Sequence, residues 1–224
     1  MENIDLMKDK KVIFLDLDGV IFDVFKRNYQ AYKDILKKYG KSPLAFKEYI
    51  DLKKKMVSFR EILRKTKAGN ISERFGKEWN DLIEKPNYLK LDRITRQKKE
   101  VLLTLKKEYP IILVTLRKDK KALYEQLKKK KIIKIFDKIL ITSGRSQYPK
   151  WKIKSKLLKK YGKFNKNSII IGDTETEILA GKHLGIKTIA IANGMRGKKF
   201  LQKYKPDALI DNFSKVKNIL NLKR

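Results

Sequence analysis

Short apolar runs alternate with longer amphipathic stretches along most of this 224-residue chain. The apolar runs are rich in β-branched residues and lack polar alternation, which is typical of strands covered on both faces. They lie at 12–17, 111–115, 138–141, 168–172, 187–192 and, more weakly, 208–210, with helical patterns at about 90–108, 118–130, 151–162, 175–184, 198–204 and 213–221. Because strands that alternate with helices form right-handed βαβ units, we expect an α/β fold with a doubly wound, mostly parallel, Rossmann-like sheet.

One interval breaks this alternation. From 24 to 86 the pattern indicates no buried strand and predicts helices instead, at 25–39, 44–56, 59–67 and 71–84. Glycine-containing turn signals separate several of them, and Ser72 stands where a helix N-cap is expected. We therefore predict an α/β core built from 1–23 and 87–224, with a small helical bundle inserted at 24–86.

Composition excludes several classes of protein. No run approaches the roughly 18 uncharged apolar residues that a membrane span requires, and the first residues show no small-residue cleavage site, so no signal peptide is predicted. The chain has no cysteine and one histidine, which excludes disulfides, thiolate metal sites and multi-histidine cages. We expect a soluble, cytoplasmic protein with no membrane partner, of an oligomeric state that the sequence does not predict.

The net charge is the most unusual property of the chain. Lysine and arginine together number 57 against 25 acidic residues, a formal charge of +32. Such a charge attracts polyanions, so a nucleic-acid partner is one interpretation. However, 47 of the 57 basic residues are lysines and they are spread from end to end. Since arginine is the residue that grips phosphate with two hydrogen bonds, solvated lysine-rich helix faces are the favoured interpretation.

Two carboxylates follow the first predicted strand. In the segment VIFLDLDGV, Asp16 and Asp18 are two positions apart, so their side chains point to the same side of an extended chain. Ligands of open parallel sheets gather at the carboxyl ends of the strands, and Gly19 permits a sharp turn there. The pair indicates a ligand site, although aspartates that merely cap a turn are the simpler alternative.

A third carboxylate follows another predicted strand. Asp173 comes directly after the run SIIIG, while Glu175 and Glu177 fall in the first turn of the next helix, where the helix dipole alone favours negative charge. Asp16, Asp18 and Asp173 then offer hard oxygen ligands at one edge of the sheet. This is the ligand chemistry that Mg²⁺ prefers, together with phosphate and water.

Two further groups suit the binding of an anion. Thr115 ends the run PIILVT, where its hydroxyl can hold an anionic oxygen or simply complete the strand end. A lysine in the helix that precedes the strand at 168–172 is the second group. The candidates are Lys150, Lys152, Lys154 and Lys156. In so lysine-rich a chain, an exposed surface position is the default for each of them.

Together these elements resemble the haloacid dehalogenase superfamily of aspartate-nucleophile phosphohydrolases, close to its phosphoglycolate-phosphatase-like members. The first motif of the family, hhhhDxDGxx, is matched by DLDGV at 16–20, the second by IILVT at 111–115, and the fourth, hhhhGDxxxD, by IIIGDTETE at 169–177. The last position departs from the motif, because Glu177 replaces an aspartate. The third motif is a single lysine, for which the spacing favours Lys150 over Lys152. The motifs occur in the family's order and cover nearly the whole chain.

The resemblance implies a role for each matched residue. Asp16 would be the nucleophile that forms an aspartyl-phosphate, and Asp18 the general acid and base. Asp16, Asp173 and the backbone carbonyl of Asp18 would hold Mg²⁺, while Thr115 and Lys150 would bind phosphate oxygens. In this family the second aspartate distinguishes phosphatases from dehalogenases and phosphonate-cleaving enzymes. The inserted helices stand where family members carry a helical cap.

Two supporting positions complete the expected site. Gly19 and Glu177 would lie behind the metal ligands. The resemblance thus predicts a Mg²⁺-dependent phosphomonoester hydrolase with a small phosphorylated substrate. Three alternatives stay open: a basic nucleic-acid- or partner-binding protein on the same scaffold, a phosphatase that acts on nucleotides or nucleic-acid ends, and a phosphomutase that transfers the phosphoryl group to a sugar.

Overall fold

The computed structural model describes residues 11–142 and 147–222. The first ten residues, which contributed to the expectation of no signal peptide, lie outside the described part of the chain. The strands form a parallel sheet in the order β3-β2-β1-β4-β5-β6. They are β1 (Ile13–Leu15), β2 (Ile111–Thr115), β3 (Lys138–Ile141), β4 (Ile169–Gly172), β5 (Lys187–Ile191) and β6 (Ala208–Ile210). This order is the doubly wound arrangement and confirms the predicted fold class.

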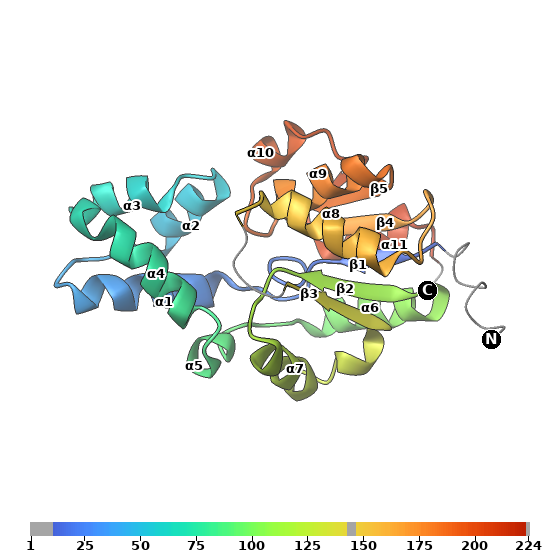
Figure 1. Cartoon of the computed structure of the whole chain (residues 1–224), viewed down its shortest axis with the longest axis horizontal. Coiled ribbons are helices and arrows are strands. Elements are labelled where there is room, and N and C mark those ends of the chain that lie inside the picture. Colours follow the sequence, from blue (N-terminus) through green and yellow to red (C-terminus); the bar gives the residue numbers. More distant parts are fainter. Residues whose placement is uncertain (1–10, 143–146, 223–224) are drawn as a thin grey trace.

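Helices cover both faces of the sheet (Figure 1). On one face, Ile13 and Leu15 of β1 pack in a cluster with α6 (Arg96–Glu108), α7 (Lys120–Lys129) and α11 (Val216–Ile219). On the other face, Phe14 packs with α8 (Lys150–Tyr161) and α9 (Glu175–Leu184). Both faces of β1 are therefore buried, which is why its sequence is apolar without alternation. The peripheral elements are α10 (Lys198–Gln202) and the 3₁₀ turns η2 (Ile133–Ile135) and η3 (Phe213–Lys215).

The central strand places three chain segments at one edge. β1 pairs with β2 on one side and with β4 on the other, with Leu15 opposite Leu113 and Ile171. The chain runs outward from β1 through β2 to β3 and then returns to β4, so the switch point of the topology lies beside β1. In sheets of this kind, ligands bind in the crevice beyond the carboxyl ends of the strands at that point.

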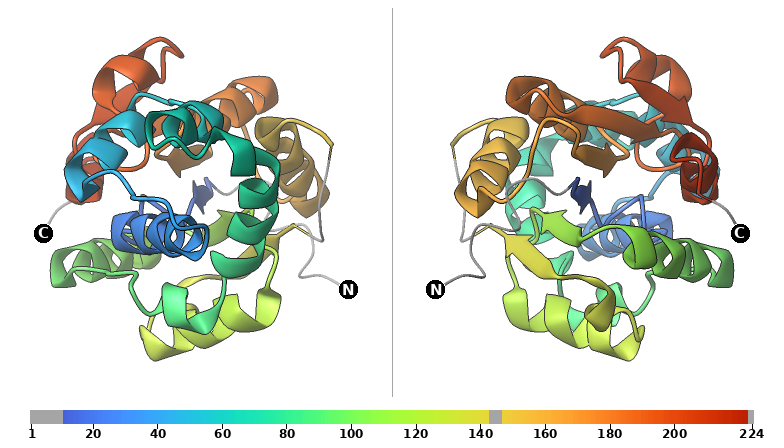
Figure 2. Two further views of the ribbon diagram at one scale, coloured as in Figure 1. Left: turned by 90° about the vertical axis from the view of Figure 1, so that its left-hand side faces the viewer. Right: turned by 90° about the vertical axis from the view of Figure 1, so that its right-hand side faces the viewer.

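A separate group of helices lies to one side of the sheet (Figures 1 and 2). These are α1 (Phe25–Lys38), α2 (Phe46–Lys54), α3 (Phe59–Lys65) and α4 (Ser72–Leu82), followed by the short α5 (Pro86–Leu89). The first four form an apolar cluster of their own, in which Tyr32 stacks on Tyr49 with 4.5 Å between ring centroids and Phe75 is fully buried. We call α1–α4 the helical segment.

Two chain connections join the helical segment to the sheet. They run side by side at Asp23 and Arg93, whose backbone N–H groups each donate to the other's carbonyl at 2.8 and 3.1 Å. The helix predicted at 90–108 therefore begins only at Arg96, with the Thr95 hydroxyl accepting from the backbone N–H of Lys98. Residues 90–95 serve as the return connection.

The helix ends show one further correction. Ser58 and Glu61 form a capping box at the start of α3, which satisfies backbone N–H groups at both positions. Ser72, in contrast, is not the cap of α4, because the 3₁₀ turn η1 (Gly69–Ile71) leads directly into this helix and Ser72 is its first residue. No helix in the described ranges is long and apolar enough to span a membrane.

We expect the aromatic cluster to decide the stability of the helical segment. Replacing Phe75, which contacts Tyr32, Phe59 and Trp79, by alanine should cost about 3–5 kcal/mol because it leaves a cavity. Phe46 is 42% exposed, so Phe46→Ala should cost about 1 kcal/mol or less. Chemical denaturation of both variants measures these costs, and equal losses would contradict the cluster as described.

Candidate active site

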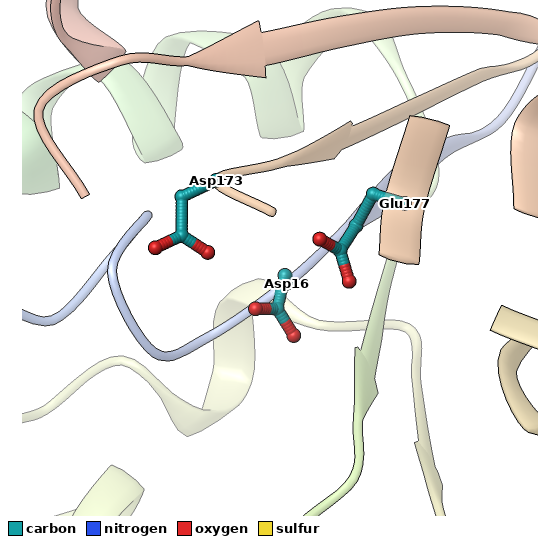
Figure 3. A group of neighbouring side chains, drawn as sticks. All are labelled: Asp16, Asp173 and Glu177. Atoms are coloured by element: carbon teal, nitrogen blue, oxygen red, sulfur yellow. The ribbon is translucent and has the colours of Figure 1, made fainter. Parts of the chain in front are cut away.

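Three acidic side chains and one lysine meet at the carboxyl edge of the sheet (Figure 3 shows the acids). Asp16 follows β1, Asp173 follows β4, and Glu177 lies in the first turn of α9. Carboxylate oxygens of these three residues lie within 4.8 Å of one another, and all three side chains are buried. Lys154 of α8 places its Nζ 2.6 Å from Asp16 Oδ1 and pairs with Glu177 as well. The edge of the sheet thus brings together chain segments more than 150 residues apart.

The carboxylate of Asp173 sits in a cradle of backbone. A Cβ on Gly19 would lie 1.8 Å from its Oδ2, and a Cβ on Gly194 would lie 2.3 Å from the same atom. Gly19 also has φ of +85°, a conformation that glycine alone adopts readily. The N–H of Met195 donates to Oδ2 at 2.6 Å, whereas Oδ1 is buried without a hydrogen-bond partner in the described residues.

The negative charges of Asp16, Asp173 and Glu177 are only partly balanced by Lys154. Burial, together with repulsion from Glu177 and Asp18, raises the pKa of Asp16 from 3.8 to about 7 in spite of Lys154. Burial and the neighbouring Asp16 and Glu177 carboxylates raise the pKa of Asp173 well above its ordinary value. One ammonium group cannot balance three buried carboxylates, and a divalent cation would do so. The unpartnered Asp173 oxygen and the all-oxygen donor set fit Mg²⁺.

Lys154, and not Lys150, is the lysine that contacts Asp16. Burial would lower the pKa of Lys154, but the carboxylates of Asp16 and Glu177 outweigh it and raise this pKa above its ordinary value. The helix explains the correction. Lys150 is the first residue of α8 and stays exposed at the pocket, whereas Lys154, one turn later, faces the sheet with Ser155 and Leu158.

Glu177 lies closer to the centre than predicted. Its Oε2 accepts hydrogen bonds from the backbone N–H and the hydroxyl of Thr174, which forms a capping box at the start of α9. Its Oε1 pairs with Lys154. Glu177 therefore starts the helix, orients the lysine and contributes to the acidic group, although the motif expects an aspartate here.

Asp18 makes contacts that differ from those of Asp16. Its carboxylate lies outside the acidic group and is held by two arginines, with Arg117 Nη2 2.5 Å from Oδ1 and Arg27 Nη2 2.9 Å from Oδ2. Burial opposes the ionisation of Asp18, but the two guanidinium groups outweigh it and hold its pKa well below the usual range. The prediction that Asp18 helps to hold a metal thus has no support from its carboxylate.

Sequence analysis missed the network behind Asp18. Asp92, fully buried in the return connection, lies 3.1 Å from both Arg27 Nε and Arg117 Nη2. Gln126 of α7 donates to Asp92 and accepts from Arg117. Burial and the charge of Asp18, only partly offset by the arginines, raise the pKa of Asp92 to about 6. Arg117 follows the second motif by two positions, but nothing in the sequence pairs it with Arg27 or Asp92.

Thr115 completes the site from β2, the strand beside β1. It is the last residue of β2, is buried, and its Oγ1 accepts from the backbone N–H of Arg117 at 3.3 Å, which leaves the hydroxyl proton to donate. Thr115, Asp16, Asp18 and Asp173 all line one pocket of about 240 Å³. The structure thus brings these four predicted residues together, and Lys150 lines the same pocket from the exposed start of α8 without an ion pair to Asp16 among the described contacts.

The sequence of this chain is similar to those of known proteins. The family model of haloacid dehalogenase-like hydrolases matches residues 12–191. The pyrophosphatase PpaX of Bacillus cereus is 29% identical over 125 residues, 54% of this chain and 57% of that protein. The PpaX of Anoxybacillus flavithermus is 36% identical over 55 residues, 25% of this chain and 26% of that protein. The matched part of the chain therefore spans between about a quarter and just over half of the length of these curated relatives.

Solved structures share the fold over almost their whole length. A haloacid dehalogenase-like family hydrolase from Streptococcus pneumoniae has a TM-score of 0.75 at 20% identity, covering 94% of this chain and 98% of that one. A predicted phosphoglycolate phosphatase from Haemophilus somnus has a TM-score of 0.73 at 20% identity, with the same coverage. At this identity the likeness establishes the fold alone.

The raised pKa of Asp16 predicts that the free energy of unfolding depends on pH when a metal chelator is present. A carboxyl whose folded pKa is about 7 against 3.8 binds more protons when folded, so its stabilising contribution is lost as pH rises from about 4 to about 7. Asp16→Asn abolishes this dependence. The free energy of unfolding of Asp16→Asn minus that of the unsubstituted protein should rise with pH by up to about 1.4 kcal/mol per unit.

Denaturant titrations between pH 4 and 8 measure this difference. The matched control is Asp51→Asn, which removes an exposed carboxylate from α2. The free energy of unfolding of Asp51→Asn minus that of the unsubstituted protein should not change with pH. A flat difference for Asp16→Asn would show that the buried carboxylate ionises at its ordinary pKa.

Proposed function

This chain belongs to the haloacid dehalogenase-like hydrolase family, and from that premise we propose that it hydrolyses phosphomonoesters with Mg²⁺ through an aspartyl-phosphate on Asp16. The observation that carries the proposal is the meeting of Asp16, Asp173, Glu177 and Lys154 at the carboxyl edge of the sheet. Pyrophosphatase and phosphoglycolate phosphatase are the activities in the names of two relatives, and both break a phosphorus–oxygen bond of a small molecule.

Asp16 is suited to be the nucleophile. Lys154 binds its Oδ1, which fixes the orientation of the carboxylate, and Oδ2 has no hydrogen bond to any described residue. We propose that Oδ2 attacks phosphorus while the bond to the ester oxygen breaks, so that the phosphoryl group is transferred to Asp16. Covalent transfer of this kind divides one difficult hydrolysis into two easier steps.

Asp18 supplies the proton transfers in this proposal. It donates a proton to the departing ester oxygen and then accepts one from the water that attacks the aspartyl-phosphate, which releases inorganic phosphate and restores Asp16. In the structure both of its oxygens are held by Arg117 and Arg27. The acid–base role therefore requires Asp18 to release at least one of these bonds and to take up a proton before the ester oxygen departs; the proton that it later accepts from water restores this state.

The remaining residues bind charge. Asp16 and Asp173, with the Asp18 backbone carbonyl that the family resemblance implies, would hold Mg²⁺. When bound, the cation would neutralise the carboxylates and polarise the phosphoryl oxygens. The Thr115 hydroxyl and the Lys154 ammonium would then stabilise the negative charge that develops on those oxygens.

We propose that the helical segment, within the inserted region predicted at 24–86, acts as a cap. Arg27 and Asn28 of α1 and Ile83 and Glu84 beyond α4 line the same pocket as Asp16. At about 240 Å³ the pocket is smaller than the roughly 300–1,000 Å³ that is usual for small-molecule sites. The small volume therefore favours a small phosphorylated metabolite over a nucleic-acid end.

Phosphate release tests the proposed reaction. Purified protein should hydrolyse p-nitrophenyl phosphate with Mg²⁺ and lose this activity in chelator. Asp16→Asn should lower kcat by about a thousandfold or more, because it removes the nucleophile. Thermal unfolding of the variant confirms that it is folded, and Asp51→Asn serves as the control for loss of an exposed carboxylate. Full activity of folded Asp16→Asn would exclude the aspartyl-phosphate.

A second experiment separates the lysines of α8. Lys154→Gln should lower kcat by about a hundredfold, since the charge that orients Asp16 and faces the phosphoryl oxygens is lost. Lys152→Gln removes an exposed charge from the same helix and should leave kcat within about twofold. Steady-state kinetics on p-nitrophenyl phosphate measure both. If Lys152→Gln has the larger effect, the assignment of the motif lysine is wrong.

A further inference from the structure

Three cationic residues lie in or beside the pocket, and the proposed reaction uses none of them. Lys53 lies near the end of α2, Lys150 begins α8, and Arg196 belongs to the loop after β5. Lys150 and Arg196 line the pocket itself. Arg196 Nη1 lies 3.5 Å from the Lys53 carbonyl oxygen, and the positive charges of Arg196 and Lys150 lower the pKa of Lys53. The three come from the helical segment and from two places in the core.

This arrangement is electrostatically unfavourable as it stands. Arg196 pairs with Glu175 at 3.1 Å, but neither Lys53 nor Lys150 has an ion pair with any described residue. Lys53 Nζ lies 3.9 Å from the centroid of the Phe59 ring, and burial is the main reason that its pKa falls to about 8. Three positive charges therefore share one carboxylate at a partly desolvated place, where an anion would relieve their repulsion.

Backbone contacts hold Arg196 beside the end of α2. Arg196 Nη1 donates to the carbonyls of Lys53 and Met195 at 3.5 and 3.3 Å, and the N–H of Gly197 donates to the Lys54 carbonyl at 3.0 Å. The loop after β5 is thereby attached to the end of α2. Most lysines of this chain lie on exposed helix faces, whereas the Lys53 and Arg196 side chains are partly buried, and Lys150 is exposed but lines the pocket.

We propose that Lys53, Lys150 and Arg196 bind a second negatively charged group of the substrate, a carboxylate or a phosphate on the leaving group. This inference rests on the proposed function and deepens it. The acidic group and Lys154 would bind the phosphoryl group that is transferred, and the three cations would bind the other end of the same small molecule. A leaving group without charge would leave their repulsion in place.

Paired substrates that differ only in this charge test the proposal. 2-Phosphoglycolate carries a carboxylate where 2-hydroxyethyl phosphate carries a hydroxymethyl group, and pyrophosphate supplies a phosphate leaving group. We expect kcat/KM for at least one anionic substrate to exceed that for 2-hydroxyethyl phosphate by about tenfold to a hundredfold, the size of one charge-assisted hydrogen bond. The better of the two anionic substrates identifies which group is bound.

The preference should depend on the cations. Lys53→Gln and Arg196→Gln should each lower the anionic-to-neutral ratio of kcat/KM by about tenfold. The matched controls are Lys47→Gln and Arg60→Gln, which remove exposed charges from α2 and α3 and should leave the ratio unchanged. Equal efficiency on charged and neutral leaving groups, or the same loss in the controls, would overturn the inference.

Binding of a non-hydrolysable anion separates this inference from the proposed reaction. Methylenediphosphonate can be titrated calorimetrically into the unsubstituted protein, Lys53→Gln and Lys47→Gln with Mg²⁺ present. Weaker binding to Lys53→Gln alone would support the anion site even if no phosphomonoester is hydrolysed. Equal binding to all three proteins would reject the site whether or not hydrolysis is observed.

Discussion

The ion pair between Lys154 and Asp16 is the interaction on which the site depends. Three buried carboxylates at one sheet edge repel each other, and Lys154 is the ammonium group that contacts two of them. Its place on α8 requires this helix to pack against the sheet in one register, with Ser155 and Leu158 buried beside it. The remaining negative charge suits this edge of the sheet to a divalent cation, so the same carboxylates that repel each other provide the proposed metal ligands.

A second ionic network links the helical segment to this site. Arg27 belongs to α1, yet it lies 2.9 Å from Asp18 and 3.1 Å from Asp92 in the return connection. Arg117 contacts the same two carboxylates from the core. Any rotation of the helical segment about the paired connections at Asp23 must therefore strain the contacts of Asp18. In this way the position of the proposed cap and the orientation of Asp18, the proposed acid–base residue, are coupled by direct contact.

The sequence predicted the position of a residue well where that position follows from a strand end. Asp16, Thr115 and Asp173 all follow apolar runs, and parallel pairing brings those ends together. It selected Lys150, whereas Lys154, one turn further along α8, contacts Asp16, because the choice depends on how this helix packs. Nor did it find the contacts of Arg27, since packing between segments distant in the chain creates them and no local pattern records them.

The arginines are enriched at the pocket, which the net charge of the chain does not indicate. The chain has 47 lysines and ten arginines, yet Arg27, Arg117 and Arg196 all line the pocket. Arg117 contacts Asp18, Asp92 and Gln126 with different nitrogens of one planar group, which a single ammonium could not do without moving. Lysine suffices where a charge only has to be solvated. In such a chain, the scarce arginines are therefore better guides to a built ionic site than the total charge of +32.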